Sequence, residues 1–238
     1  IAAKDGDVLR QIKRKPAAIV TFLEGTSPRR PNVEQCKGVG SALAEMHHAT
    51  TKFSGYRPNN LSLDAWHELW SACQRSEDLL VRDLTSELSF ELDTILSSWP
   101  KTLPHGIVHA DLFPDNVFFR GNQLSGLIDF YFACNDITTY DLAICINAWC
   151  FEEGAEFNIT KARALAGAYH QKRPLSRAEL DALPILSRGA CMRFLLTRLY
   201  DWVHAVDGAL VEPKDPREYL SKLRFHRDVK GPGAYGFD

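Results

Sequence analysis

Four polar residues in one stretch of the chain have the types and spacing that phosphoryl transfer from ATP requires. His109, Asp111 and Asn116 form the pattern His-x-Asp-x-x-x-x-Asn, and Asp129 ends an apolar run that follows a turn. Magnesium prefers oxygen ligands, which an asparagine carbonyl and a carboxylate supply. A second carboxylate must accept the proton of the attacking hydroxyl group. A loop followed by a hairpin would bring Asp111, Asn116 and Asp129 to one place.

Each of these residues taken alone has a plainer interpretation. A single aspartate at the end of a loop or strand usually caps a turn, and a lone histidine more often makes a structural hydrogen bond. The joint pattern, with apolar strands on both sides, favours phosphotransfer. Asp115 lies inside the loop but off the pattern, and we interpret it as a residue that forms hydrogen bonds within the loop.

The elements that must position this segment follow from the spacing of apolar residues. Two strand-like runs come first, at residues 8–12 and 17–23, and helical stripes follow them. Helices are expected at residues 33–46, 61–73, 80–96 and 188–204 and from 140 onward, with helix starts at 176–179 and 215–218. Between residues 104 and 130 the pattern predicts a small hairpin with a turn at Gly121 and Asn122. The order of elements predicts an α+β fold.

The composition excludes several classes of partner. The 238 residues carry 28 lysines and arginines against 30 aspartates and glutamates, a net charge of −2, which gives no electrostatic case for nucleic acid or an anionic membrane. The most apolar stretch, residues 142–151, is far shorter than the ~20 residues that span a bilayer. Six cysteines without a C-x-x-C pair or structural-zinc spacing indicate reduced, mostly buried thiols in a cytoplasmic protein.

The sequence around the motif resembles a known family. The pattern His-Ala-Asp-x-x-x-x-Asn at residues 109–116, followed by Ile-Asp-Phe at 128–130, is similar to the signature of the aminoglycoside phosphotransferase and choline kinase superfamily. Residues 128–136, 140–143, 147–149, 193–202 and 219–226 resemble the bacterial homoserine kinase branch of that superfamily. The likeness extends from residue 22 to residue 226. It implies a protein-kinase-like fold with a mainly helical C-terminal lobe and a small catalytic hairpin.

The resemblance also implies roles for individual residues. Asp111 matches the family's catalytic base, Asn116 and Asp129 its magnesium ligands, and His109 a residue that holds the catalytic loop. Asp141 matches an aspartate that braces this loop from the next helix. Phe22, Leu23 and Glu24 match the hinge between two lobes, where backbone groups bind the adenine of ATP. Tyr131 stands where protein kinases have glycine, which is usual outside the protein kinases.

The acceptor pocket is predicted from the chemistry of homoserine. Its carboxylate requires a guanidinium group and its ammonium group requires oxygen ligands. Arg193 and Arg198 lie five residues apart on one expected helix, so only one of them is expected to reach the site. The other candidates follow the magnesium aspartate or the bracing aspartate: Tyr131, Asn135, Asp136 and Asn147. Trp149 is expected to pack in the core.

The division into lobes follows from the motif map. Residues 1–25 would be a remnant of an N-terminal β lobe with the hinge, and residues 26–238 the C-terminal catalytic lobe. A glycine-rich phosphate loop, a strand lysine and its helix glutamate are absent from this sequence. We therefore expect the 238-residue chain alone to have negligible kinase activity.

Several alternatives stay open at this stage. The acceptor could be choline, ethanolamine, a sugar or an aminoglycoside, although an aminoglycoside pocket should be strongly acidic and this chain is nearly neutral. A choline pocket should be an aromatic cage without a carboxylate-binding arginine. A further hypothesis is that the protein is a catalytically inactive binding module. Whether it forms a homodimer is also open. The expected substrates are Mg²⁺-ATP and a small molecule.

Overall fold

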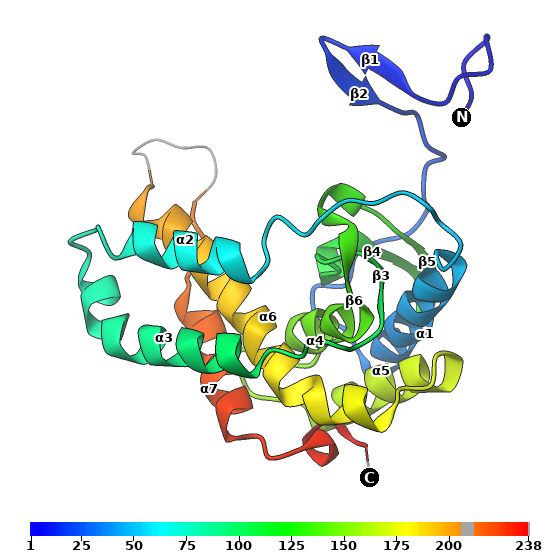
Figure 1. The fold of residues 1–238 in the computed structure, drawn as a ribbon. Helices are drawn as coiled ribbons and strands as arrows, with labels where there is room; N and C mark the ends of the chain where they lie inside the picture. The colour runs from blue at the N-terminus through cyan, green and yellow to red at the C-terminus, as the bar shows by residue number, and fades with distance from the viewer. Residues whose placement is uncertain (206–211, 238) are drawn as a thin grey trace.

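Most of the polypeptide in the computed structural model is helical (Figure 1). The structure describes residues 1–205 and 212–237. Its helices are α1 (Val33–Ala49), α2 (Leu63–Cys73), α3 (Leu79–Ser98), α4 (Thr138–Trp149), α5 (Ile159–Lys172), α6 (Arg177–Val203) and α7 (Arg217–Asp228). Its strands are β1 (Arg10–Ile12), β2 (Lys15–Ala17), β3 (His105–Val108), β4 (Val117–Arg120), β5 (Gln123–Leu127) and β6 (Cys134–Ile137). Short 3₁₀ turns lie at Pro114–Asn116, Phe130–Phe132 and Pro232–Tyr235.

The helices begin where side chains can accept hydrogen bonds from free backbone N–H groups. Asn32 and Gln35 form a capping box at the start of α1, and Ser176 and Glu179 form the expected one at the start of α6. Helix α6 therefore begins eleven residues before the predicted start at 188 and continues through Pro184. Proline inside a helix removes one hydrogen bond, but the flanking residues pack into both cores and keep the helix continuous.

Helix α4 separates two hydrophobic cores. One face, including Tyr140, Ala143 and Ile144, packs with α2, α3, α6 and α7. The opposite face, including Leu142 and Ile146, packs with α1 and α5. Burial of nearly every α4 side chain explains why this stretch is the most apolar in the sequence. Among the described residues, no helix is both long and apolar enough to cross a membrane. All six cysteines are buried and unpaired.

The N-terminal hairpin β1–β2 stands apart from the helical body in Figure 1. The expected strand at residues 17–23 is wrong, because β2 ends at Ala17 and residues 18–24 form no strand. A strand requires a hydrogen-bonding partner, and the described residues offer none along this stretch. The side chains of Val20 and Phe22 are accordingly exposed, at 77% and 85%.

Two further antiparallel pairs surround the catalytic segment. The predicted hairpin is β4–β5, in which Arg120 pairs with Gln123 across a two-residue turn, and Gly121 has φ of 61°. Strand β6 pairs with β3, so that Ile107 faces Asn135. The apolar spacing does not predict β6, because its residues Asn135 and Asp136 interrupt the alternation of apolar side chains. The register pairs Val108 with Cys134, so β6 begins beside the end of β3, where the catalytic loop starts.

Candidate active site

Two buried charged side chains hold the loop after β3 by hydrogen bonds to the backbone of one residue, Ala110. Ala110 has φ of 63°, a left-handed conformation that costs an alanine about 1–2 kcal/mol. Its N–H donates to Oδ1 of Asp141 over 2.9 Å, and its carbonyl accepts a hydrogen bond from Nη1 of Arg193. The other carboxylate oxygen of Asp141 accepts from the N–H of His109 over 2.7 Å. Together these bonds fix the backbone next to Asp111.

Asp141 lies in a buried polar cluster that joins three helices. Nε2 of His47, from α1, lies 3.1 Å from Oδ2 of Asp141, and Nδ1 of His47 lies 2.7 Å from the hydroxyl of Tyr169, from α5. Burial alone would raise the pKa of Asp141, but its hydrogen bonds to His47 and to the backbone of His109 outweigh it and lower the pKa below 3.8. The carboxylate is therefore charged, as a brace for the loop requires.

His109 connects the catalytic loop to the end of β5. Its Nε2 lies 2.9 Å from the carbonyl of Ile128, and its Nδ1 accepts from the N–H of Asp111 over 3.3 Å. These partners assign the proton to Nε2. The ring is fully buried and does not line the cavity described next. His109 therefore lies where it can hold the catalytic loop, because it links Asp111 to the neighbour of Asp129, and its role in the reaction stays a prediction.

The structure brings the three predicted catalytic side chains into one cavity of about 310 Å³. Its lining residues are Asp111, Phe113, Asp115, Asn116, Asp129, Phe194, Arg198 and Lys214. The side-chain amide of Asn116 donates to the carbonyl of Asp111 over 2.8 Å, and the carbonyl of Asn116 accepts from the N–H of Ile128 over 2.9 Å. The loop and the hairpin are thus fastened together at the point where the functional groups meet.

The donor set in this cavity fits magnesium. Because the amide nitrogen of Asn116 is used within the loop, its oxygen is left for another partner. Asp129, with φ of 63°, presents a carboxylate at the cavity wall. Among the described residues there is no cluster of three or more His, Cys, Asp or Glu side chains that could hold a metal alone. Magnesium is typically held by one or two carboxylates together with substrate phosphates, which this pair of ligands would match.

Asp111 has a raised pKa, which makes its carboxylate a better proton acceptor. Burial is the main cause, and the negative charge of Asp129 adds to it. The positive charges of Arg193 and Lys214 act in the opposite direction. A general base gains strength as its pKa approaches the working pH. Asp115, by contrast, takes part in the loop through its carbonyl, which accepts a hydrogen bond from the hydroxyl of Ser27.

The residues predicted to line the acceptor pocket after β5 hold a neighbouring segment in place. Oδ1 of Asn135 accepts from the N–H of Arg57, and Oδ2 of Asp136 accepts from the side chain of Asn59 over 2.6 Å. The guanidinium group of Arg57 donates to the carbonyl of Tyr131, whose own ring is 71% exposed. Asn135 and Asp136 therefore fasten the segment between α1 and α2 to β6. None of the three lines the cavity around Asp111.

Asn147 and Trp149 lie in the core behind the catalytic loop. The amide nitrogen of Asn147 donates to the carbonyl of Ser187 over 3.0 Å, and its oxygen accepts from Nε2 of His226 over 2.6 Å. Both ends of this buried amide are thus bonded within the core, so the structure does not bring Asn147 into the cavity, and its contact with the acceptor stays a prediction. Trp149 is buried as expected, and its Nε1 donates to the carbonyl of Leu112 over 2.8 Å. This hydrogen bond ties the catalytic loop to α4.

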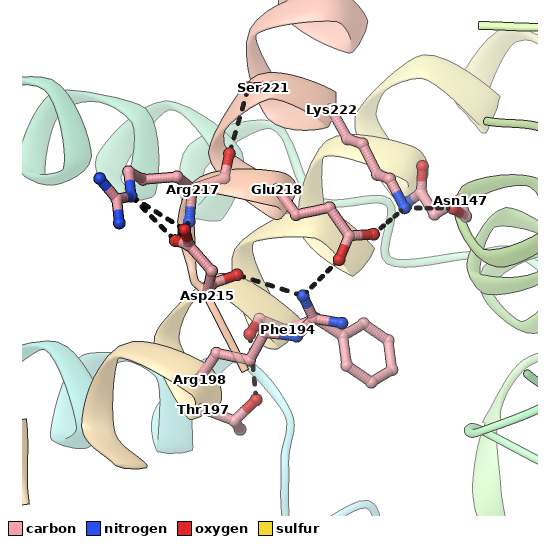
Figure 2. Close-up of polar contacts among 9 residues, drawn as sticks. All are labelled: Asn147, Phe194, Thr197, Arg198, Asp215, Arg217, Glu218, Ser221 and Lys222. Carbon is pink, nitrogen blue, oxygen red and sulfur yellow. Dashed lines mark hydrogen bonds and ion pairs between the residues drawn. The ribbon is translucent and has the colours of Figure 1, made fainter. Parts of the chain in front are cut away.

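The two candidate arginines have different surroundings. Arg193 is 2% exposed, and its guanidinium group lies 4.6 Å from the ring of Phe194 and 5.5 Å from that of Phe132. Arg193 binds the carbonyl of Ala110 and does not line the cavity, so it lies where it can hold the catalytic loop, and its contact with the acceptor stays a prediction. Arg198 does line the cavity, and it pairs with Glu218 of α7 over 2.7 Å (Figure 2).

The predicted hinge residues run beside the β4–β5 hairpin. The N–H of Thr26 donates to the carbonyl of Phe119 over 2.9 Å, which begins this contact. Glu24 forms an ion pair with Arg120. The side chain of Leu23 packs so closely over Gly126 that a Cβ there would lie 2.6 Å from Cδ1 of Leu23. The side chain of Phe22 points to solvent, and a role of its backbone in adenine binding stays a prediction.

Sequence reasoning missed several residues that shape the site. His47 continues the apolar stripe of α1, four residues after Leu43, and a histidine on a buried stripe was the available signal. Arg57 and Trp149 act through long-range contacts that local spacing does not reveal. Lys214 lies outside every motif, and no pattern in the sequence indicates its position in the cavity wall.

Comparisons with known proteins agree with this geometry. Residues 2–175 match the model of the phosphotransferase enzyme family. The homoserine kinase of Parvibaculum lavamentivorans is 56% identical over all of this chain, which covers 74% of that protein. The homoserine kinase of Rhodospirillum rubrum is 56% identical over 99% of the chain and 74% of its own length.

A solved structure shows the same fold. The choline/ethanolamine kinase family protein of Mesorhizobium loti has a TM-score of 0.61 and 16% identity, over 92% of this chain and 72% of that one. At this level of identity the likeness concerns the fold, which is kinase-like with a helical C-terminal lobe. The family match and the identity to the two curated relatives go further: the chain belongs to the phosphotransferase enzyme family.

Proposed function

We propose that the protein phosphorylates the hydroxyl group of L-homoserine with ATP and forms O-phospho-L-homoserine for threonine biosynthesis in the cytoplasm. Curated homoserine kinases share 53–56% identity with the chain over nearly all of its length. The observation that carries the proposal is the convergence of Asp111, Asn116 and Asp129 in one cavity. The co-substrates are ATP and Mg²⁺.

The chemistry assigned to the site is in-line transfer of a phosphoryl group. Asp111 accepts the proton of the acceptor hydroxyl group. The oxygen of that hydroxyl group forms a bond to the γ-phosphorus, and the bond between the γ-phosphorus and the leaving ADP oxygen breaks. Magnesium, when bound, supplies positive charge that stabilises the phosphate oxygens. Asn116 and Asp129 would hold it. His109, Asp141 and the other residues that fix the loop backbone keep Asp111 aimed at the hydroxyl.

The other acceptors considered from the sequence are less well supported. The kinases of choline and ethanolamine are structural neighbours at 16% identity, which concerns the fold alone. An inactive binding module is disfavoured, because a chain without catalysis has no need to keep a base and two magnesium ligands at one cavity. The acceptor is best tested directly, with a panel of amino alcohols, choline and aminoglycosides and the full-length enzyme with Mg²⁺-ATP.

Asp111→Asn is the decisive variant for the mechanism. Loss of a general base typically reduces the rate by about 10²–10⁴-fold, and we expect such a fall in kcat for homoserine. The affinity for Mg²⁺-ATP should change little, because asparagine keeps the size of the side chain. Both are measured by a coupled ADP-release assay and by nucleotide titration. Near-normal turnover in this variant would remove Asp111 from the role of base.

A further inference from the structure

One wall of the catalytic cavity is cationic. Arg198, near the C-terminal end of α6, and Lys214, just before α7, both line the cavity that contains Asp111 and Asp129. The positive charge of Lys214 is close enough to Asp111 to act on its pKa. This cationic wall, Arg198 with Lys214, is separate from Arg193, whose guanidinium group is committed to the catalytic loop.

Arg198 is held rigidly but keeps donors free. Its side chain is 12% exposed, and its guanidinium group lies 4.5 Å from the ring of Tyr219. Both of its hydrogen bonds leave from Nη1, to Oε2 of Glu218 over 2.7 Å and to the carbonyl of Asp215 over 3.3 Å (Figure 2). Within the described part of the chain, Nη2 and Nε have no partner. A guanidinium group in this state can bind a carboxylate through two donors.

The charges around the cationic wall do not cancel. Glu218 divides its carboxylate between Arg198 and the Nζ of Lys222, which lies 2.6 Å from Oε1 and is almost buried (Figure 2). Arg217 and Asp215 neutralise each other. At this corner of α6 and α7, four cations therefore face two anions, and Lys214 is exposed at its edge. The same cavity also holds the carboxylates of Asp111, Asp115 and Asp129, so the cationic wall is the part of it that suits a negative group.

The position of the wall favours the acceptor over the nucleotide. The predicted hinge is tied to the β4–β5 hairpin through Thr26 and to the catalytic loop through Ser27. In Figure 1 the C-terminal half of α6 (orange) lies on the other side of the catalytic segment, away from β5. Two aromatic side chains, Phe113 and Phe194, line the cavity with their ring centres 5.0 Å apart. They offer an apolar surface for the methylene groups of an acceptor.

We propose that Arg198 and Lys214 bind the carboxylate of the acceptor and make the enzyme select alcohols that carry a carboxylate over purely cationic ones. Glu218 and Lys222 are positioning residues that hold Arg198. This inference rests on the proposed function, because it concerns the acceptor of the same site. It predicts that the acceptor pocket is formed at the corner of α6 and α7.

The test compares two acceptors that differ only in the carboxylate. L-homoserine and 3-aminopropan-1-ol are assayed with Mg²⁺-ATP in the full-length enzyme and in the variants Arg198→Gln, Lys214→Gln and Arg227→Gln. A charged hydrogen-bonded pair contributes enough to change KM by about 10- to 100-fold. We expect such a rise in the homoserine KM for Arg198→Gln and a smaller one for Lys214→Gln, with the ATP KM and the activity on 3-aminopropan-1-ol preserved. Arg227→Gln is the matched control, because Arg227 is also on α7 but pairs with Glu87 and does not line the cavity. It should behave as the wild type.

The outcomes separate the possible failures. Unchanged homoserine KM in both cavity variants would overturn the proposal and leave the kinase function standing, as would equal wild-type activity on the two alcohols. A rise in the ATP KM in the same proportion would assign the cationic wall to phosphate. Failure of the wild type to phosphorylate homoserine would overturn the proposed function and this proposal with it. Because Lys214 is exposed, its variant tests the idea even if Arg198→Gln folds poorly.

Discussion

At the scale of single residues, the site depends on an alanine held in an unfavourable conformation. Ala110 keeps φ of 63° because its N–H and its carbonyl are bound by opposite charges, Asp141 and Arg193. Strained backbone of this kind persists only where surrounding groups fix it. The buried charges of Asp141 and Arg193 in turn need these backbone partners, since a buried charge without a partner is strongly destabilising. The position of the Asp111 carboxylate therefore depends on side chains that do not contact the substrate.

Arg193→Met tests this positioning role. Without the guanidinium group the Ala110 carbonyl loses its partner and Asp111 loses its alignment, and a displacement of about 1 Å can reduce a rate by about 100-fold. We expect kcat to fall by about that factor while the ATP KM stays within about twofold. Arg188→Met is the matched control, because Arg188 is also on α6 but pairs with the buried Glu91 of α3 over 2.6 Å instead of with the catalytic loop. A loss of kcat in both variants would reduce Arg193 to a stabilising residue.

At the scale of elements, the packing of α1 on α5 sets the position of the brace. His47 comes from α1 and Tyr169 from α5, and the two meet beside Asp141. The helices approach most closely at Gly40, where an added Cβ would overlap the carbonyl oxygen of Leu165. A glycine in a helix is unfavourable in itself, and here it is required by the short distance between the two backbones.

Gly40→Ala and Gly167→Ala should therefore have opposite effects on stability. The first forces α1 and α5 apart, and overpacking of this kind costs about 1–3 kcal/mol or more. The second adds a methyl group to α5 with nothing within 4 Å, so it should stabilise the helix by about 1 kcal/mol. Denaturant unfolding measures both changes. If Gly40→Ala proved as stable as the wild type, the close approach of α1 and α5 would be wrong.

At the scale of the whole molecule, a buried polar cluster joins the C-terminal elements to α4. Nδ1 of His226 lies 2.8 Å from the hydroxyl of Tyr235, and its Nε2 bonds to Asn147. Nζ of Lys222 donates to the carbonyl of Asn147 over 3.0 Å. These contacts fasten α7 and the last turn to the helix that carries Asp141.

The stability of the protein should depend on pH through His226. Burial, followed by the charges of Lys222 and Arg188, lowers the pKa of His226 from 6.5 to about 3. Between these values the unfolded chain binds the proton and the folded protein does not. The free energy of unfolding therefore falls as the pH decreases from 6.5 towards 3, by about 1.4 kcal/mol per pH unit from this group. His226→Gln should remove this part of the slope in unfolding experiments.

The control for this measurement is His48→Gln, since His48 lies exposed on α1. It should leave the pH dependence as it is in the wild type. A slope that is the same in all three proteins would show that His226 is not the titrating group.

The whole molecule also bears on activity. The 238-residue chain has no glycine-rich phosphate loop with its strand lysine, and both contribute to phosphate binding in the kinases that the chain resembles. We expect the purified 238 residues to release ADP at a negligible rate. Normal turnover by the 238 residues, measured in the same coupled assay, would contradict the expectation. The division at residue 25 stays a prediction of the same kind.

The sequence alone determined the chemistry and most of the helices. Asp111, Asn116 and Asp129 lie within one loop and one hairpin, so their convergence follows from short-range geometry and could be predicted. The apolar stripes located α1 to α3 because this signal is also local.

Only the tertiary structure decided which polar residues act at the site and which hold it. Arg193 and Arg198 look equivalent in the sequence, yet one is buried on the Ala110 carbonyl and the other lines the cavity. Asn147 was placed in the pocket by the sequence but has both ends of its amide engaged in the core. Lys214 reaches the cavity only through the packing of α7 on α6. Burial and long-range partners set these roles, and neither is encoded in local spacing.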